Sequence, residues 1–200
     1  NLGHEVAGVV TELGPAVSGV EVGDRVVILG PAQHAPGWSA DGGFANKGLA
    51  MAEGLTMLPD TVDFVQGATA TDAGQTAYGA VMSTGKVREG EHVGIVGLGL
   101  TGARIAVVAG ARVYAAEPNL EVWPLAAERG VAELVEDVRE LASFDLDVIF
   151  DFAGFGTTTA GAISTVHPGG RVVVVGLGRN EATISTAELV YKSVTLRGSR

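Results

Sequence analysis

A short glycine-rich segment is the clearest candidate for chemistry in this sequence. Residues 97–102 read GLGLTG, follow the apolar run 92–96 and precede the helix-like run 103–109. Glycines in this spacing, between a strand and a helix, permit a tight turn, a close approach of pyrophosphate and close helix packing. The pattern predicts a dinucleotide at the helix N-terminus, with an ordinary strand-to-helix turn as the alternative. The residues expected to contact it are Gly97, Gly99, Leu100 and Gly102.

A carboxylate closes the next apolar run. Residues 112–116 lead into Glu117, which could accept hydrogen bonds from the ribose hydroxyls of an adenosine. The same charge would repel a 2′-phosphate, and no Lys or Arg occurs between Glu117 and Arg129. We therefore predict NAD as the cofactor rather than NADP. A solvated side chain at a strand end is the alternative interpretation of Glu117.

The composition narrows the class of partner. The formal charge is −10 and the Lys and Arg residues are scattered, which argues against duplex nucleic acid or an anionic membrane as partner. No apolar run approaches the roughly 18 residues of a membrane helix, and the start NLGHEV has no signal-peptide pattern. We expect a cytoplasmic protein that acts on a small molecule. The absence of Cys excludes disulfides and Cys-based zinc sites within these residues.

The elements that would position these side chains follow from the hydrophobic pattern. Near-continuous apolar runs alternate with helix-like segments at 121–129 and 135–141, which predicts an α/β fold with a doubly wound parallel Rossmann sheet. The runs expected to form its strands are 92–96, 112–116, 148–152, 170–175 and 193–196. The helix expected at 103–109 would be only about 10 Å long, so either this crossover is trimmed or residues before Leu100 are missing.

The N-terminal part has a different pattern. Strand-like runs at 6–10, 23–28 and 44–49, separated by Gly and Pro turns and an irregular loop at 30–43, predict a small β-rich region. Residues 63–82 have helical spacing, and Gly74 predicts a bend between two helical stretches. We expect two domains, at 1–70 and 71–200.

Several short runs along nearly the whole chain carry a resemblance. They are GHE at 3–5, GGFA at 42–45, DAG at 72–74, the glycine loop, DFAG at 151–154 and PGGRV at 168–172. Together they resemble the zinc-type alcohol dehydrogenases of the medium-chain dehydrogenase/reductase family. The resemblance implies part of a GroES-like catalytic domain before the Rossmann domain, and a homodimer or homotetramer.

The same resemblance implies a catalytic zinc. It makes His4 and Asp72 zinc ligands, with Tyr78 six residues after Asp72 as in the family pattern, and Glu5 an exchanging ligand. Imidazole and carboxylate are suitable groups for a zinc that keeps one position open for substrate. For Asp72, a helix N-cap is the alternative role. The resemblance also places residues at the nicotinamide, namely Thr76, Val175, Gly176 and Leu177.

The sequence departs from the family pattern in two places. The Cys ligand and the proton-relay hydroxyl that precede the GHE run in the family are not in these 200 residues, so we expect a central fragment. Residues 30–41 stand where the family has a four-Cys zinc lobe. Their His34 and Trp38 either line a substrate pocket or belong to an ordinary exposed loop.

These observations favour one function over two others. The leading hypothesis is a zinc-dependent oxidoreductase that transfers a hydride between NAD and an alcohol, aldehyde or ketone. A zinc-free quinone or enoyl reductase of the same family is the first alternative, against which His4 and Glu117 speak. The second is a Rossmann module that binds NAD without turnover, which the fold cannot exclude.

Overall fold

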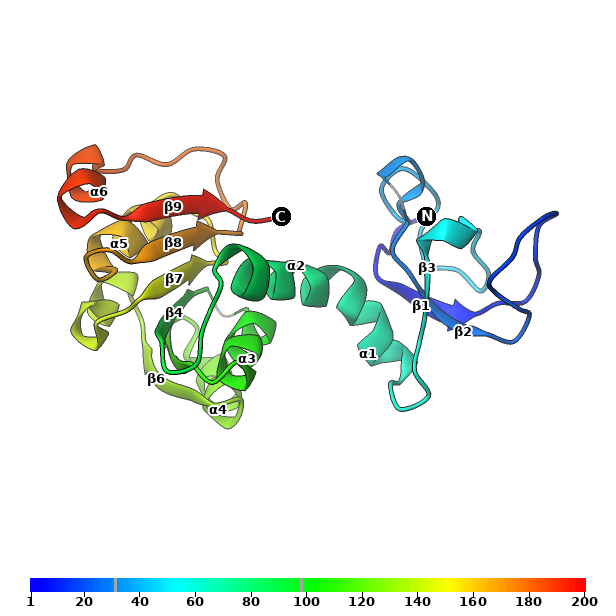
Figure 1. Cartoon of the computed structure of the whole chain (residues 1–200), viewed down its shortest axis with the longest axis horizontal. Coiled ribbons are helices and arrows are strands. Elements are labelled where there is room, and N and C mark those ends of the chain that lie inside the picture. The colour runs from blue at the N-terminus through cyan, green and yellow to red at the C-terminus, as the bar shows by residue number, and fades with distance from the viewer. Residues whose placement is uncertain (31, 98) are drawn as a thin grey trace. The chain divides into compact units, whose positions relative to one another are not determined.

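The chain folds as two compact units, Asn1–Gln75 and Thr76–Arg200 (Figure 1). The computed structural model describes residues 1–30, 32–97 and 99–200. The sequence predicted the division between residues 70 and 71, and the structure divides between Gln75 and Thr76.

The first unit is built on a small antiparallel sheet. Its strands are β1 (Val6–Val9), β2 (Arg25–Ile28) and β3 (Leu55–Met57), in the order β1-β2-β3. The central strand β2 buries Val26 and Val27 beside Leu58. These strands confirm the expected β-rich region.

A strand expected at 44–49 does not form, and that prediction was wrong. Gly43 and Phe44 donate backbone hydrogen bonds to Gly3 and Leu2, after which residues 44–50 form no ladder. The edge of β2 is taken instead by β3, where Val27 pairs with Thr56. Alternation alone could not tell which run would find a partner strand.

One helical run crosses the boundary between the units. It consists of α1 (Phe64–Thr69), a π-helical turn (Ala70–Gly74), α2 (Gln75–Tyr78) and a second π-helical turn (Gly79–Thr84). It begins with a capping box, in which Asp63 Oδ1 accepts from the backbone N–H of Gln66 at 2.7 Å. Gly74, where the sequence predicted a bend between two helical stretches, ends the first π-helical turn, which joins α1 to α2.

The second unit is a six-stranded parallel sheet with helices on both faces (Figure 1). The order β6-β5-β4-β7-β8-β9 is that of a doubly wound fold, which confirms the predicted class. Its strands are β4 (His92–Val96), β5 (Arg112–Ala116), β6 (Val131–Val135), β7 (Val148–Asp151), β8 (Arg171–Val174) and β9 (Thr195–Gly198). Its α-helices after β4 are α3 (Leu100–Val108), α4 (Trp123–Glu128), α5 (Thr157–Thr165) and α6 (Thr186–Lys192).

Alternating side chains of the sheet divide into two cores, one on each face. The strand residues of the first core, which packs against α3 and α4, are Val93, Ile95, Val113, Ala115, Val131, Val148, Phe150 and Val173. Those of the second core, which packs against α5 and the 3₁₀ helix Val138–Phe144, are Val96, Tyr114, Ala116, Ile149 and Val172. Strands covered on both faces are apolar throughout, which is why the sequence pattern revealed them.

The edge strand β6 was not predicted from the sequence. Residues 135–141 were predicted as a helix, whereas Val135 ends β6 and a 3₁₀ helix covers Val138–Phe144. Because β6 has β5 on only one side, several of its side chains are exposed and its pattern is not that of a buried strand.

The crossover from β4 to β5 is longer than predicted. Helix α3 begins at Leu100 rather than Ala103 and has 9 residues, about 13 Å of helix. This length carries the chain back to β5, where Arg112 pairs with His92. Leu98, in the expected glycine loop, and Pro31, in the expected loop 30–43, lie outside the described residues. Over the described part of the chain, no helix combines the length and apolarity needed to cross a membrane.

Candidate dinucleotide and metal sites

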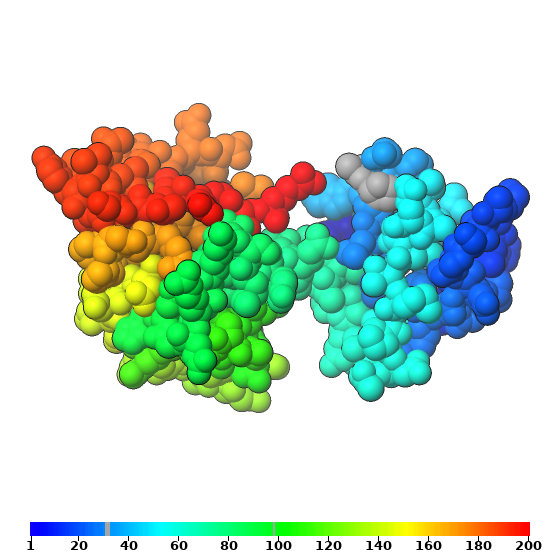
Figure 2. Space-filling view, in the orientation of Figure 1, coloured from blue at the N-terminus to red at the C-terminus, as the bar shows by residue number. Residues whose placement is uncertain are grey.

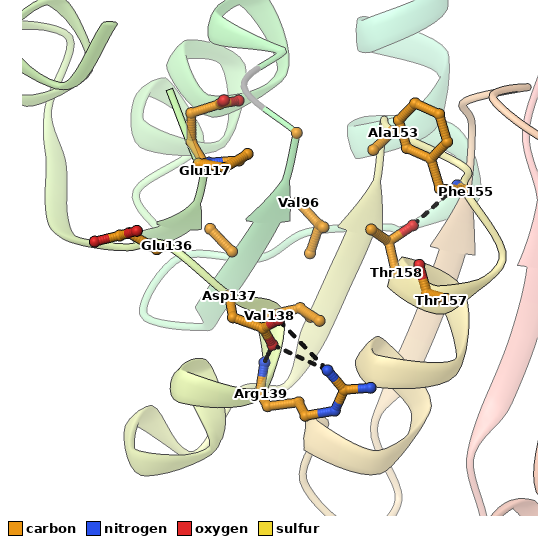
Figure 3. Close-up of a pocket in the computed structure, with 13 residues that line it drawn as sticks. Val96, Glu117, Glu136, Asp137, Val138, Arg139, Ala153, Phe155, Thr157 and Thr158 are labelled. Atoms are coloured by element: carbon orange, nitrogen blue, oxygen red, sulfur yellow. Dashed lines mark hydrogen bonds and ion pairs between the residues drawn. The ribbon is translucent and has the colours of Figure 1, made fainter. Parts of the chain in front are cut away.

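A pocket of about 350 Å³ opens at the carboxyl ends of the parallel strands β4, β5, β6 and β7 (Figure 3). In open α/β sheets, ligands bind outside these strand ends, where the strand order reverses. Here the order reverses between β4 and β7. The lining residues are Val96, Gly97, Ala116, Glu117, Pro118, Glu136, Asp137, Val138, Arg139, Ala153, Phe155, Thr157 and Thr158.

Two glycines of the loop, Gly99 and Gly102, pack against one aromatic ring. A Cβ on Gly99 would lie 3.0 Å from the Phe152 ring, and one on Gly102 would lie 2.5 Å from it. Gly97 has φ of +71° and approaches Ala153 so closely that a Cβ would lie 2.8 Å from the alanine methyl. The third glycine therefore makes room for a side chain from the end of β7.

Two of the predicted cofactor residues line the pocket itself. Gly97 and Glu117 are part of its wall, whereas Gly99, Leu100 and Gly102 stand at the start of α3, beside the wall. Gly99 is the N-cap of this helix, and no side chain caps it.

The surroundings of Glu117 fix its backbone. Its Oε1 accepts from the N–H of Asn119 at 2.8 Å, and its backbone carbonyl accepts from the indole of Trp123 at 2.9 Å. The side chain lines the pocket, as a ribose-binding carboxylate requires.

The sequence analysis missed a cation in the same pocket. Arg139 lines the wall that includes Glu117, and its Nη1 lies 3.4 Å from each carboxylate oxygen of Asp137 (Figure 3). A count of basic residues that stopped at Arg129 could not reveal it, because β6 pairs with β5 and returns residues 136–139 to this strand end. The pocket therefore combines Glu117 with an internally paired arginine.

The residues predicted at the nicotinamide lie outside this wall. The backbone N–H groups of Val175 and Gly176 donate to the carbonyl of Asp151 at 2.9 and 3.0 Å, just after β8 ends. Leu177 follows with 86% of its surface exposed. Thr76 lies in α2 and does not line the pocket.

In the first unit, the three predicted metal residues converge. His4 Nε2 lies 2.9 Å from Asp72 Oδ2, although the residues are far apart in sequence. Both side chains are about half exposed, at 42% and 52%. Glu5 lies beside the pair, where its Oε1 accepts from the backbone N–H of Ala73 at 3.0 Å.

This pair has the donor chemistry of a zinc site. An imidazole nitrogen and a carboxylate oxygen in direct contact need only a small separation to bind one cation, since two ligand atoms on a zinc lie about 3 to 4 Å apart. Within the described ranges, no group of three or more His, Cys, Asp or Glu side chains is placed to hold a metal. His4 and Asp72 thus fit zinc as two of its ligands.

An aromatic side chain stands beside the pair. The ring centroid of Trp38 lies 5.4 Å from that of His4, and 76% of Trp38 is exposed. Its position depends on backbone contacts, because a Cβ on the preceding Gly37 would lie 2.9 Å from the carbonyl of Gly3. His34 is exposed in the 3₁₀ helix Ala32–His34. Among the residues that the structure describes, the ring in contact with His4 is that of Trp38 and not that of His34.

Comparison with known families covers both units. The family model for the GroES-like domain of alcohol dehydrogenases matches residues 1–60, and that for zinc-binding dehydrogenases matches residues 97–200. An alcohol dehydrogenase of Geobacillus stearothermophilus is 31% identical over 98% of this chain and 67% of its own length.

Solved structures of dehydrogenases are also similar to this chain over nearly its whole length. The alcohol dehydrogenase of the archaeon Aeropyrum pernix matches with a TM-score of 0.87 and 27% identity, over 99% of this chain and 67% of that one. A zinc-binding dehydrogenase from Sinorhizobium meliloti 1021, solved with NADP bound, matches with a TM-score of 0.89 and 27% identity, over 99% and 68% of the two chains. The chain thus spans about two thirds of the length of these relatives.

Proposed function

This chain belongs to the zinc-type alcohol dehydrogenases of the medium-chain dehydrogenase/reductase family, and from that premise we propose that it is an NAD- and zinc-dependent oxidoreductase. The proposed reaction moves a hydride between NAD and an alcohol, aldehyde or ketone. The observation that carries the proposal is the contact of 2.9 Å between His4 and Asp72, which are suitable metal ligands.

In the proposed metal site, His4 Nε2 and Asp72 Oδ2 hold the ion. Bound zinc would polarise the oxygen of the substrate and lower the pKa of an alcohol. Glu5 positions the turn that carries Asp72, because it accepts from the N–H of Ala73. The family resemblance implies that the carboxylate of Glu5 is an exchanging ligand of the metal.

In the proposed cofactor site, the adenosine half of NAD occupies the pocket at the strand ends. Glu117 accepts hydrogen bonds from the ribose hydroxyls and disfavours a 2′-phosphate. The Sinorhizobium relative was solved with NADP, so family membership alone does not select the cofactor. Arg139 does not reverse the preference, because the pocket lining holds three carboxylates, Glu117, Glu136 and Asp137, against this one arginine.

The nicotinamide half would extend toward residues that follow β8. We propose that Thr76, Val175, Gly176 and Leu177 border it, as the family resemblance implies. The cofactor supplies the redox chemistry, and the protein supplies position and electrostatics. The acidic composition, with a net charge of −10, supports a small-molecule substrate rather than a nucleic-acid partner.

The metal site can be tested by zinc titration of the full chain in a calorimeter. We expect one zinc per chain, and we expect Asp72→Asn and His4→Ala to weaken its binding at least about tenfold, since each removes a ligand. His167→Ala is the matched control, because His167 belongs to the other unit and lies near Asp145. Equal zinc binding by all four proteins would refute the assignment.

Turnover is measured separately as NADH formed from NAD and a panel of primary and secondary alcohols. Zinc-dependent turnover is the expected result. Zinc-independent reduction of quinones or enoyl thioesters with NADPH would establish the zinc-free alternative, and NAD binding without any turnover would establish a binding module.

A further inference from the structure

One carboxylate is buried completely, and its side chain has no role in the two sites described above. Asp151, at the end of β7, has no exposed surface and is the one buried charged side chain among the residues that the structure describes. Burial of a charge is costly unless hydrogen bonds compensate for its lost hydration. The contacts of Asp151 must therefore compensate for the lost hydration of its charge.

Four donors from the following segment converge on this carboxylate. Oδ1 accepts from the backbone N–H groups of Ala153 at 3.2 Å and Gly154 at 2.8 Å. Oδ2 accepts from the hydroxyls of Thr158 at 2.9 Å and Thr159 at 2.6 Å. An ionised carboxylate can accept all four bonds because it offers several lone pairs and no donor of its own.

These bonds define the turn between β7 and α5. Thr158 links the carboxylate to the middle of the turn, since its hydroxyl also accepts from the N–H of Phe155 at 3.0 Å (Figure 3). Gly154 has φ of +63°, and a Cβ there would collide with the backbone carbonyl of Gly176. The turn is thus held from inside by Asp151 and lies against the segment after β8.

The turn forms one wall of the pocket at the strand ends. Ala153, Phe155, Thr157 and Thr158 line the pocket, whereas Thr159 does not. Both threonines donate to the same oxygen of Asp151, but only Thr158 joins that oxygen to the wall.

We propose that Asp151 is a positioning residue of the dinucleotide site, which sets the pocket wall 153–158 through the hydroxyl of Thr158. The proposal rests on the function proposed above, in which this pocket takes the adenosine half of NAD. Asp151 itself is fully buried and does not line the pocket. It acts through the turn, and the turn shapes the surface that the nucleotide contacts.

Two threonine variants of the full chain separate positioning from stability. Thr158→Val removes the hydroxyl bonds to Asp151 and to the N–H of Phe155, whereas Thr159→Val removes one hydroxyl bond to Asp151. Urea unfolding measures the loss of stability in each variant separately from binding. We expect Thr158→Val to raise the Kd for NAD and for AMP about five- to tenfold, the effect of about one lost hydrogen bond. Thr159→Val should leave both Kd values within about twofold of the original chain, and Thr158→Ser, which keeps the hydroxyl, should restore binding.

Asp151→Asn provides the second measurement. In this variant one of the two carboxylate oxygens becomes an NH2 group, which donates and does not accept, so only one pair of the four donors keeps its acceptor. The variant should therefore bind NAD and AMP at least as weakly as Thr158→Val. If the original chain binds NAD and the Thr158 and Thr159 variants bind it equally well, the positioning role is refuted and the proposed function stands. If the original chain binds neither NAD nor AMP, the proposed cofactor site fails, and the inference fails with it.

Discussion

At the scale of single residues, the proposed preference for NAD depends on one carboxylate. Glu117 lines the pocket and is joined there by Arg139, whose charge is balanced by Asp137. A pocket with an unbalanced arginine would favour a 2′-phosphate, whereas this one presents an acid and a neutral ion pair. The proposed cofactor preference therefore rests on the side chains at the strand ends and does not follow from the fold.

We predict that Glu117→Ala weakens NAD binding by about 1 to 3 kcal/mol, because the ribose hydroxyls lose their acceptor. Glu117→Gln keeps an acceptor without the charge, so it should retain most of the NAD affinity and bind NADP more tightly than the original chain does. Fluorescence titration of the three proteins with both nucleotides measures these effects. NADP binding as tight as NAD binding in the original chain would contradict the prediction.

Trp38 offers a spectroscopic report on the metal site. Its ring lies 5.4 Å from the ring of His4, and the chain has 2 tryptophans, so Trp123→Phe leaves Trp38 as the single indole. Zinc would draw His4 out of its contact with Asp72 and change the surroundings of the indole. We predict a saturable change in the emission of Trp123→Phe on zinc titration.

The control for this experiment is Trp38→Phe, which should bind zinc in a calorimeter but show no saturable fluorescence change. Addition of His4→Ala to Trp123→Phe should abolish the change, since the ligand is gone. Calorimetric zinc binding by Trp123→Phe with constant emission would show that the metal lies elsewhere.

At the scale of elements, the turn after β7 and the segment after β8 are held together by backbone hydrogen bonds. Val175 and Gly176 donate to the carbonyl of Asp151, and Arg179 donates to that of Gly154. These bonds continue the pairing of the two strands beyond their ends. The close approach requires glycine, because a Cβ on Gly176 would collide with the carbonyl of Phe152.

We predict that Gly176→Ala lowers the free energy of unfolding by about 1 to 3 kcal/mol, because a methyl group in this contact forces the two segments apart. Gly198→Ala in β9 is the matched control: nothing lies within 4 Å of its Cβ position, so its effect should stay within about 0.5 kcal/mol. Urea unfolding measures both. Equal stability of the two variants would show that the segments separate easily.

The elements also show what the sequence pattern could predict. Strands β4 and β5 were predicted at their observed bounds, because burial on both faces makes each of them a continuous apolar run. The edge strand β6 was missed, and with it the return of Arg139 to the pocket. Hydrophobic periodicity reports burial, so an edge strand with exposed side chains carries little of that signal.

The candidate site likewise contains residues that the sequence could predict and residues that it could not. His4 and Asp72 were paired on the strength of a family resemblance, and the structure brings them to 2.9 Å. The role of Asp151 could not be predicted, although its run was noted, because its four donors meet only when the chain turns into α5. A buried acceptor is defined by a three-dimensional arrangement of donors that spacing along the chain does not specify.

At the scale of the whole molecule, the two units have unequal cores. Both large hydrophobic clusters lie in the second unit, whereas the buried apolar side chains described in the first unit are Val26, Val27 and Leu58. Burial of apolar surface is the main stabilising contribution to folding. We infer that the parallel sheet is the stable scaffold, and its outer strands become the surfaces available for assembly.

The strand β9 is one such surface. It ends the sheet, all four of its residues are exposed, and the red C-terminal segment is visible on the surface in Figure 2. The N–H groups of Thr195 and Ser199 point inward, to the carbonyls of Gly170 and Val174. Since successive N–H groups of a strand alternate in direction, that of Leu196 points outward, where a second copy could accept it.

We predict that the full chain is a homodimer or homotetramer that pairs through this edge. Leu196→Pro removes the outward donor and leaves the inward bonds, so it should reduce the assembly to a monomer at micromolar concentration without unfolding the sheet. Leu196→Ala is the control, because it keeps the backbone donor and should keep the assembly. Light scattering gives the mass of each protein, and circular dichroism shows whether the sheet is retained. A monomeric original chain, or an oligomer unaffected by the proline, would exclude pairing at β9, since an edge that lacks its outward donor cannot extend the ladder.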